Sequence, residues 1–326
     1  MEGKIALGLD VAKSTIEACL LRDGQKRGDR TTIDNSIAGG QKLLTWLHGT
    51  DLSEVHVCLE PTGKYSRVVA AFLHEAGLKV SQVNSYAVLS HGRSKNYRNK
   101  TDRIDAYLLA DYCLKENPPT WSPPASSHVE LSELQARIDE IEEMLGQEKN
   151  RFSAGGMSAL VQSDIQEHIA QLIVRKEKLE KAAKDLIDTD ALLSANFKIV
   201  HSIIGLGEKS ALGLLSAVRF EQFQKPRSVG CFAGLTPRRF ESGTSVYKRE
   251  CISRKGSNQL RKRLYFPAMV AMQYNPQMRA FAERLRAKGK PPKVIICAVM
   301  RKLLVLTATL IRKQEFYDPQ KGLAIA

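Results

Sequence analysis

Four carboxylates stand where an α/β fold places catalytic groups: Asp10, Glu60, Asp102 and Asp105. Asp10 interrupts the apolar segment LGLDVAK, and Glu60 closes the strand-like segment EVHVCLEPTG. Asp102 and Asp105 are three residues apart at the start of an expected helix, so both should project from one helix face. A buried, unpaired carboxylate is costly, so Asp10 requires a compensating charge. The four residues therefore predict a site for a hard divalent cation, Mg²⁺ or Mn²⁺, that would orient and neutralise a phosphodiester.

Each carboxylate also has an ordinary structural explanation. Asp102, beside Thr101, would interact favourably with the helix dipole, and Asp105 could be a surface charge. Glu60 precedes Pro-Thr-Gly and could be a turn residue. Asp10 resists such an explanation best, and its coincidence with the other three favours a functional site.

A second reactive group is the Ser-Gly-Thr-Ser segment inside RRFESGTSVYKREC, residues 238–251. A serine hydroxyl is a weak nucleophile at neutral pH, so it needs a base, a metal or a polarised phosphate. The flanking cations could stabilise charge on phosphoryl oxygens. They are Arg238, Arg239, Lys248 and Arg249. Alone, the segment is equally compatible with a polar turn, in which Ser245 would bond to the backbone.

The positive charge of the chain is concentrated in its last third. The 326 residues include 49 Lys and Arg against 35 Asp and Glu, a formal net charge of +14. Residues 225–326 contain 22 Lys and Arg against 5 Asp and Glu, a net charge of +17, so the preceding residues carry −3. This favours a polyanionic partner bound through phosphate neutralisation. The alternative is a solvated basic face without a partner.

The pattern of apolar segments predicts three domains. Three strand-like segments, expected to form an antiparallel meander, precede alternating helices and strands up to a proline-rich linker, which indicates an α/β domain over residues 1–125. Residues 126–190 show a heptad-like apolar seam, broken at SAGGMS. This predicts an antiparallel helical hairpin on its own chain or an oligomerising coiled coil. Residues 191–326 are expected to be mostly helical and basic.

The third domain opens with IVHSIIGLGEKSALGLLSAV, which has the pattern of a helix-hairpin-helix. Gly205 and Gly207 would let backbone N–H groups approach a phosphate, at the start of the following helix. Two glycines also suit a tight structural turn. The basic surroundings favour the phosphate-binding interpretation.

The six cysteines show no zinc or disulfide spacing, which predicts reduced, buried thiols. No apolar signal segment begins the chain, and Arg301 and Lys302 break the longest apolar stretch, residues 294–311. We therefore expect a cytoplasmic protein with no membrane span.

Six motifs together resemble the DEDD transposases of the insertion-sequence-110 group, which includes the Piv and MooV DNA invertases. They are GLDVAKS, LEPTGKY, RNKTDRIDAYLLADYC, GLGEKSA, FAGLTPRRFESGTSV and ISRKGSNQLRKRLYFPAMVA. The strand order also resembles the ribonuclease H and RuvC fold. The resemblance implies a RuvC-like first domain, a helical assembly segment and a basic transposase domain with a helix-hairpin-helix.

The resemblance implies a role for each matching residue. The acidic tetrad falls on Asp10, Glu60, Asp102 and Asp105, and the catalytic serine on Ser242. Ser245 is a competing candidate that spacing cannot exclude, and Tyr247-Lys248 departs from the basic residue and Gly that often follow in similar proteins. The residues expected to bind nucleic acid are Gly205, Gly207, Lys209, Arg238, Arg239, Lys248, Arg249, Arg254, Lys255 and Arg261.

The implied activity is cutting and rejoining of DNA through a covalent phosphoserine, with donor and target double-stranded DNA as partners. The resemblance further implies a structured bridge RNA and a homo-oligomer, a dimer of dimers, that shares active sites between protomers. The rival interpretations are a RuvC-like metal-dependent nuclease or junction resolvase, a Piv-like site-specific invertase, and a non-catalytic nucleic-acid-binding scaffold.

Overall fold

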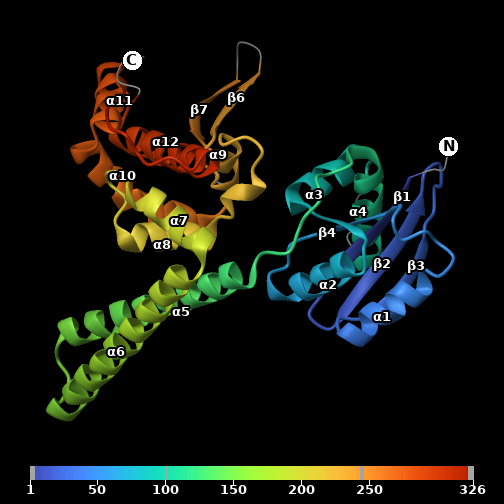
Figure 1. Cartoon of the computed structure of the whole chain (residues 1–326), viewed down its shortest axis with the longest axis horizontal. Coiled ribbons are helices and arrows are strands. Elements are labelled where there is room, and N and C mark those ends of the chain that lie inside the picture. Colours follow the sequence, from blue (N-terminus) through green and yellow to red (C-terminus); the bar gives the residue numbers. More distant parts are fainter. Residues whose placement is uncertain (1–3, 98, 100, 243–245, 254, 322–326) are drawn as a thin grey trace. The chain divides into compact units, whose positions relative to one another are not determined.

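The structure is a computed structural model that describes residues 4–97, 99, 101–242, 246–253 and 255–321, without the side chains of residue 64 and residues 239–250 (Figure 1). The chain divides into two compact units, Met1–Pro123 and Pro124–Ala326. Each unit is described by itself. The three-part division at residues 125 and 190 stays a prediction.

The N-terminal unit is built on a five-stranded mixed sheet with the strand order β3-β2-β1-β4-β5. Its strands are β1 Ile5–Val11, β2 Thr15–Arg22, β3 Asp29–Asp34, β4 Val55–Leu59 and β5 Lys79–Gln82. The first three form an antiparallel meander, whereas β4 runs parallel to β1 and β5 parallel to β4. The predicted meander and the following α/β alternation are therefore confirmed, in keeping with a RuvC-like N-terminal domain.

Two pairs of helices cover the two faces of this sheet (Figure 1). They are α1 Ile37–Trp46 and α2 Lys64–Glu75 on one face, and α3 Ser85–Ser94 and α4 Asp102–Glu116 on the other. The sequence pattern predicted α1, α2 and α4 but did not reveal α3. That helix buries only Val88 and Gly92, so its apolar face is too narrow to give a clear helical period.

Alternation along β1 sends its side chains to the two helical layers. Leu7, Leu9 and Val11 belong to the apolar cluster under α1 and α2, whereas Ala6 packs in the cluster with α4. Because successive strand side chains point to opposite faces, Gly8 and Asp10 share the α4 face with Ala6.

Gly8 allows α4 to lie directly on the sheet. A Cβ atom at this position would lie 2.0 Å from the Ala106 carbonyl oxygen and 2.4 Å from the Ala110 amide nitrogen. Any larger residue must therefore push the helix backbone away from β1.

The C-terminal unit begins with a long antiparallel helical hairpin, α5 Ser126–Ala154 and α6 Ala159–Thr189. The two helices pack on each other through Ile141, Leu145 and Leu172, all buried. Gly155 and Gly156 adopt positive φ values of 70° and 78° in the predicted break. The hairpin alternative is thus confirmed for the single chain.

The rest of this unit is mostly helical, as predicted. Its elements are α7 Ala191–His201, α8 Glu208–Ala217, the short 3-10 helix η1 Phe220–Gln222, α9 Ser228–Phe232, β6 Pro237–Ser242, β7 Val246–Ile252, α10 Asn258–Tyr274, α11 Pro276–Ala287 and α12 Pro292–Lys313. The antiparallel β6–β7 hairpin was not predicted, and Ser242, the first residue of the Ser-Gly-Thr-Ser motif, is the last residue of β6.

Helix α12 is the one helix of the described chain that has the length and apolar composition needed to cross a membrane. Half of the apolar stretch of α12 is buried within the protein, including Val299, Leu303 and Leu304. It therefore has the character of a core helix of the C-terminal unit.

The cysteine prediction is partly wrong. Cys19, Cys58 and Cys113 are buried free thiols, but Cys231 and Cys251 are exposed and Cys297 is half-buried. The exposed pair lies in α9 and β7, where short elements have one open face.

Replacing Gly8 by Ala should destabilise the N-terminal unit by about 1–3 kcal/mol, because the new methyl group meets helix backbone that cannot rotate away. Gly92→Ala is the matched control in the same layer, since its methyl group would meet the flexible end of Leu108, and it should cost under about 1 kcal/mol. Trp46 and Trp121 both pack in this unit, so urea unfolding followed by tryptophan fluorescence measures both variants. Equal losses would show that α4 is not tightly seated at Gly8.

Candidate functional site

The four predicted carboxylates all come from elements at one end of the N-terminal sheet. Asp10 lies near the end of β1 and is half-buried, and Glu60 directly follows β4 and is also half-buried. Asp102 is the first residue of α4 and is exposed, whereas Asp105 is half-buried.

Strand register relates Glu60 to Asp10. Leu9 pairs with Leu59 in the parallel β1–β4 ladder, so the residues that follow them leave adjacent strands at the same sheet edge. Carboxyl ends of adjacent parallel strands are where open α/β sheets bind ligands. The local sequence thus brings Asp10 and Glu60 to a position suited to chemistry.

Helix α4 runs antiparallel to β1 and brings its N-terminal turn toward Asp10. Ala6 clusters with Ala110 and Cys113, whereas Gly8 faces the backbone of Ala106 and Ala110. Moving along β1 therefore means moving toward the start of α4. Thr101 caps this helix by accepting a hydrogen bond from the Ile104 amide at 3.3 Å, which fixes where the two aspartates begin.

Glu17 is an acidic neighbour that the sequence alone did not reveal. It stands directly opposite Asp10 in the β1–β2 ladder, and its Oε1 accepts a 2.6 Å hydrogen bond from the Thr32 hydroxyl. Like charges placed directly opposite in a sheet are destabilising, so this edge favours a nearby cation. The register of the β1–β2 hairpin, had it been predicted, would have placed Glu17 opposite Asp10.

The donor chemistry fits a hard divalent cation, because every candidate ligand is a carboxylate oxygen. The geometry does not yet form a coordination sphere. Across the described residues, no three His, Cys, Asp or Glu side chains come close enough to hold a metal ion together. The structure therefore supplies suitable ligands at one sheet edge without an assembled metal centre.

A buried ionic network on α4 anchors the segment that leads to Asp102. Asp111 is buried and accepts hydrogen bonds from His91 at 2.6 Å, from Lys115 at 2.9 Å, and from Lys95. Burial raises the pKa of this carboxyl, but its hydrogen bonds to Lys95, His91 and Lys115 outweigh that effect and hold the pKa at about 2. Because Lys95 is the C-cap residue of α3, the network joins the end of α3 to α4.

Asp111 was missed by the sequence analysis, although the same reasoning that singled out Asp10 applies to it. It interrupts the apolar segment AYLLADYCL, where an uncompensated carboxylate would be costly. Helical spacing could have suggested its i+4 partner Lys115, but His91 and Lys95 lie 20 and 16 residues away and could not be inferred from local spacing.

Ser242 is the last residue of β6, at the far end of the two-stranded hairpin (Figure 1). Its backbone pairs with Val246, and a register shift lies between Arg238 and Phe240. The three residues between the strands, Ser245 among them, lie outside the described residues, as does Arg254. The backbone thus presents Ser242 at a hairpin tip with Lys248 and Arg249 on the partner strand.

Arg261 supports the base of this hairpin. Its guanidinium donates hydrogen bonds to the carbonyl oxygens of Ala233 and Gly256, both at 3.1 Å. It thereby joins the end of α9 to the segment between β7 and α10. Contact of Arg261 with nucleic acid stays a prediction, and so does that of Lys255, which is exposed.

The predicted helix, glycine turn and helix are present as α7 and α8. Gly205 has a φ of 108°, and a Cβ there would lie 2.6 Å from the Cβ of Ala271 on α10, so packing alone requires this glycine. Gly207 is exposed, precedes α8 and has open space around it. Lys209 forms a 2.9 Å ion pair with Glu180, so its ammonium already has a carboxylate partner.

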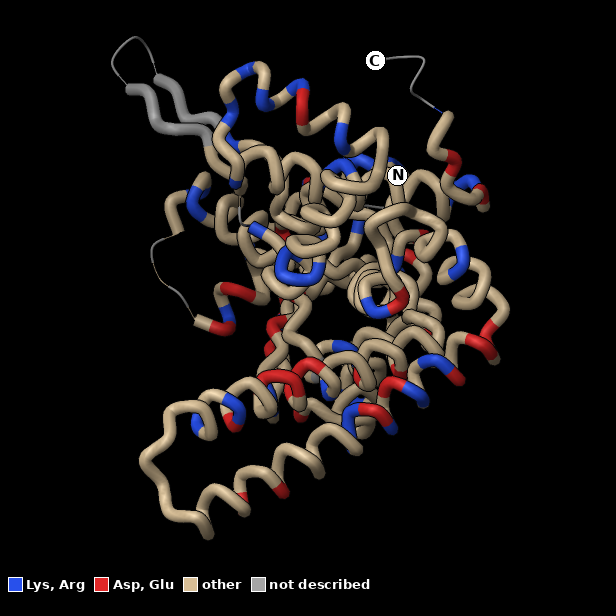
Figure 2. Tube along the Cα trace, turned by 90° about the vertical axis from the view of Figure 1, so that its left-hand side faces the viewer, with Lys and Arg blue, Asp and Glu red and all other residues tan. Residues whose placement is uncertain are grey.

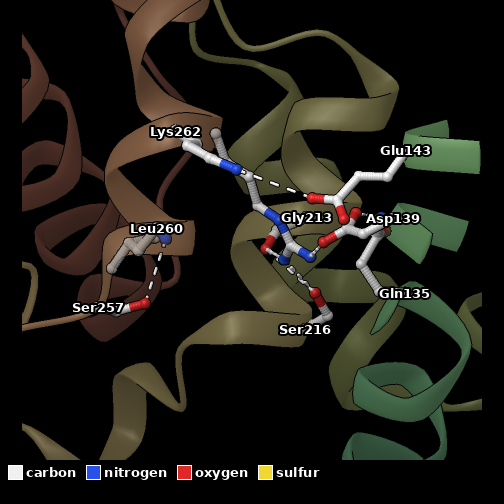
Figure 3. A network of polar contacts seen from close by, with 9 residues as sticks. Gln135, Asp139, Glu143, Gly213, Ser216, Ser257, Leu260 and Lys262 are labelled. Carbon is white, nitrogen blue, oxygen red and sulfur yellow. Dashed lines mark hydrogen bonds and ion pairs between the residues drawn. The ribbon is translucent and has the colours of Figure 1, made fainter. Parts of the chain in front are cut away.

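Helix α10 is tied to α5 and α8 by Arg263 (Figure 3). Its guanidinium donates to the Asp139 carboxylate at 2.6 Å, to the Gly213 carbonyl oxygen at 2.5 Å and to the Ser216 hydroxyl at 2.9 Å. The guanidinium reaches these acceptors through two nitrogens, Nη1 and Nη2, a planar fork that the single nitrogen of a lysine does not reproduce. Arg263 thus connects α10 to α5, the first helix of the helical hairpin, and to α8.

Comparison with known proteins agrees with this arrangement. Residues 7–155 match a family model described as a transposase, of the DEDD type found in IS110, and residues 197–283 match the Transposase IS116/IS110/IS902 family. The pilin gene-inverting protein of Moraxella bovis is 32% identical over 319 residues, which cover 97% of this chain and 98% of that protein. The chain belongs to the IS110 family of transposases.

Two further relatives are informative about this transposase. The pilin gene-inverting protein of Moraxella lacunata is also 32% identical over 97% of the chain. An uncharacterized insertion element IS110 protein of Streptomyces coelicolor is 24% identical over 185 residues, 56% of this chain and 44% of that protein. The protein is accordingly a DNA recombinase of the transposase class, and its substrates are DNA. DEDD-type transposases generally use a divalent metal ion.

Asp111→Asn should destabilise the N-terminal unit by about 3 kcal/mol, because it leaves Lys95 without its buried counter-charge. The lowered pKa of Asp111 stabilises the folded protein above about pH 4, and this contribution disappears as the pH falls through 2. Tryptophan-detected urea unfolding at several pH values should show a loss of about 2 kcal/mol across that window in the wild type, attributable to Asp111. The variant should lack this component.

Asp29→Asn is the control for that experiment. Its 2.9 Å ion pair with Arg22 is exposed, so its removal should cost under about 0.5 kcal/mol. A comparable cost for Asp29→Asn and Asp111→Asn would contradict the anchoring role of the network.

Arg263→Lys should weaken the attachment of α10 by about 1–3 kcal/mol, because one ammonium nitrogen cannot take the positions of both Nη1 and Nη2. Hydrogen exchange of peptides from α5 and α10 measures the change. Lys262→Gln, one residue earlier, removes a 3.9 Å contact with Glu143 between two exposed side chains and should cost under about 0.5 kcal/mol. If both variants left exchange unchanged, Arg263 would not hold these helices together.

Proposed function

We propose that this transposase cuts and rejoins DNA through a covalent bond between Ser242 and a DNA phosphate, assisted by the acidic residues of the N-terminal unit. The observation that carries the proposal is the pairing of two features in one chain: carboxylates held at one sheet edge by α4, and a serine at the tip of a basic hairpin. Neither feature alone distinguishes strand transfer from hydrolysis.

In the first step, the Ser242 oxygen attacks the phosphorus of a DNA phosphodiester and loses its proton. A phosphorus–oxygen bond to serine forms, and the bond to one DNA strand breaks, so that strand leaves as a free hydroxyl after taking up a proton. In the second step, a hydroxyl of another strand attacks the phosphoserine and restores the serine. The bond energy is conserved, so rejoining requires no external energy source.

Asp10, Glu60, Asp102 and Asp105 are the residues that would hold Mg²⁺ or Mn²⁺. When bound, the ion supplies charge neutralisation at the phosphodiester. Arg238, Arg239, Lys248 and Arg249 lie on the hairpin strands and would stabilise charge that develops on the phosphoryl oxygens.

We infer that the acting assembly is a homo-oligomer, a dimer of dimers, with a structured bridge RNA that pairs with donor and target DNA. This inference rests on the resemblance to the family, and the basic C-terminal third suits either nucleic acid. Site-specific inversion is the alternative event, because the pilin gene-inverting relatives match over almost the full chain.

The test is a covalent protein–DNA adduct, detected on a denaturing gel after the protein is incubated with DNA, Mg²⁺ and RNA transcribed from the non-coding DNA beside the gene. Ser242→Ala should abolish the adduct, whereas Ser245→Ala should retain it. Asp10→Asn should lower the adduct yield at least about a hundredfold while DNA binding persists.

Three outcomes would contradict the proposal. An adduct that survives in Ser242→Ala excludes the serine assignment. Free DNA ends without an adduct, lost in Asp10→Asn but unchanged in Ser242→Ala, would indicate a metal-dependent nuclease. Binding without strand breakage in any divalent metal would indicate a scaffold.

A further inference from the structure

The turn between α11 and α12 carries a dense group of cations that the candidate site does not include. Residues 283–293 have the sequence ERLRAKGKPPK, with five Lys and Arg against one Glu. We call this group the basic turn; it consists of Arg284, Arg286, Lys288, Lys290 and Lys293, all exposed. Gly289, at a φ of 69°, makes the reversal, and Pro291 and Pro292 start α12.

The cations of the basic turn differ from several cations of the helical hairpin, which have carboxylate partners. Acidic and basic residues alternate along the helical hairpin (Figure 2), where Lys176 pairs with Glu142 at 2.7 Å and Lys184 pairs with Glu208 at 3.0 Å. Within the described part of the chain, none of the five basic-turn side chains forms an ion pair with a carboxylate. Their charge is available to a partner.

The two helices also bring cations together at the edge of this turn. The Arg284 guanidinium and the Lys302 ammonium both lie over the Phe281 ring, 5.4 Å and 4.4 Å from its centroid. Burial lowers the pKa of Lys302, and the charge of Arg284 lowers it further. Such mutual repulsion is relieved when an anion binds nearby.

The residue types of the turn point to a phosphate backbone. Residues 283–293 include no aromatic side chain on which an unpaired base could stack, and no Asn or Gln that could read adenine. Lysines on a sharp turn are suited to the repeated phosphates of a duplex, which they neutralise without regard to sequence.

We propose that the basic turn is a second DNA-binding surface of the transposase, separate from the serine hairpin, that grips the phosphate backbone of double-stranded DNA. The choice of DNA rests on the recombinase activity. The surface acts by holding the duplex while the reacting phosphate is engaged elsewhere, so it contributes to affinity and not to strand cleavage.

The test compares two triple variants of the full chain. Lys288→Gln, Lys290→Gln and Lys293→Gln together remove three charges from the basic turn. Lys26→Gln, Arg27→Gln and Lys42→Gln remove three exposed charges from the N-terminal unit and match the change in net charge. All six positions are exposed, so both variants should fold, which circular dichroism confirms.

Binding to a 30-base-pair DNA duplex is measured by fluorescence anisotropy at several salt concentrations. The basic-turn variant should bind about tenfold or more weakly at 0.1 M salt, and the slope of log K against log salt should fall by about 2–3, close to 0.9 for each lost phosphate contact. The N-terminal control should retain the wild-type slope.

Equal losses in the two variants would show an effect of net charge alone and overturn the proposal. Unchanged DNA binding in the basic-turn variant would also overturn it, and so would a loss confined to a duplex RNA of the same length. Because this assay measures binding, it is separate from the adduct assay. A missing adduct with an intact basic-turn effect would refute only the serine chemistry.

Discussion

The close approach of α4 to β1 at Gly8 is the constraint on which the acidic site depends. Carboxylates repel one another, so nothing in their own chemistry gathers them at one sheet edge. They are brought there by apolar packing, because α4 lies on β1 where Gly8 leaves room for the backbone of Ala106 and Ala110. Asp10 follows Gly8 by two residues on the same face of β1 and therefore lies nearer the N-terminal turn of α4. The packing energy of the unit offsets the electrostatic cost of the site.

The sequence allowed accurate prediction where the determinants are local. The meander, the α4 start at Asp102 and the helical hairpin follow from alternation, capping and the apolar seam. Helix α3 and the β6–β7 hairpin were missed for a common reason. Neither sequence has a regular apolar period, so local pattern alone did not indicate these elements. The compensation of Asp111 was likewise partly hidden, because His91 and Lys95 come from α3 and its C-cap and only Lys115 lies on the same helix.

Net charge is a coarse guide to function, because it counts cations that stabilise the fold together with cations that could bind a partner. Arg261 and Arg263 are basic residues whose guanidinium groups bind protein carbonyl oxygens and a carboxylate, so they stabilise the fold. Lys209 is exposed but has a carboxylate partner. Only a structure separates these from cations that have no acidic neighbour. A predicted nucleic-acid contact is therefore weaker where the side chain already binds a protein group, as it does in Arg261 and Lys209.

The two halves of the proposed chemistry differ in how firmly their own unit holds them. The carboxylates lie on a five-stranded sheet with helices on both faces, and two buried layers determine their positions. Ser242 lies at the end of a two-stranded hairpin, a type of element that is marginally stable by itself and depends on how its base is secured. Arg261 provides part of that support through the carbonyl oxygens of Ala233 and Gly256. The positions of the carboxylates therefore depend on the packing of a whole unit, whereas the position of Ser242 depends on a small hairpin and on the contacts at its base.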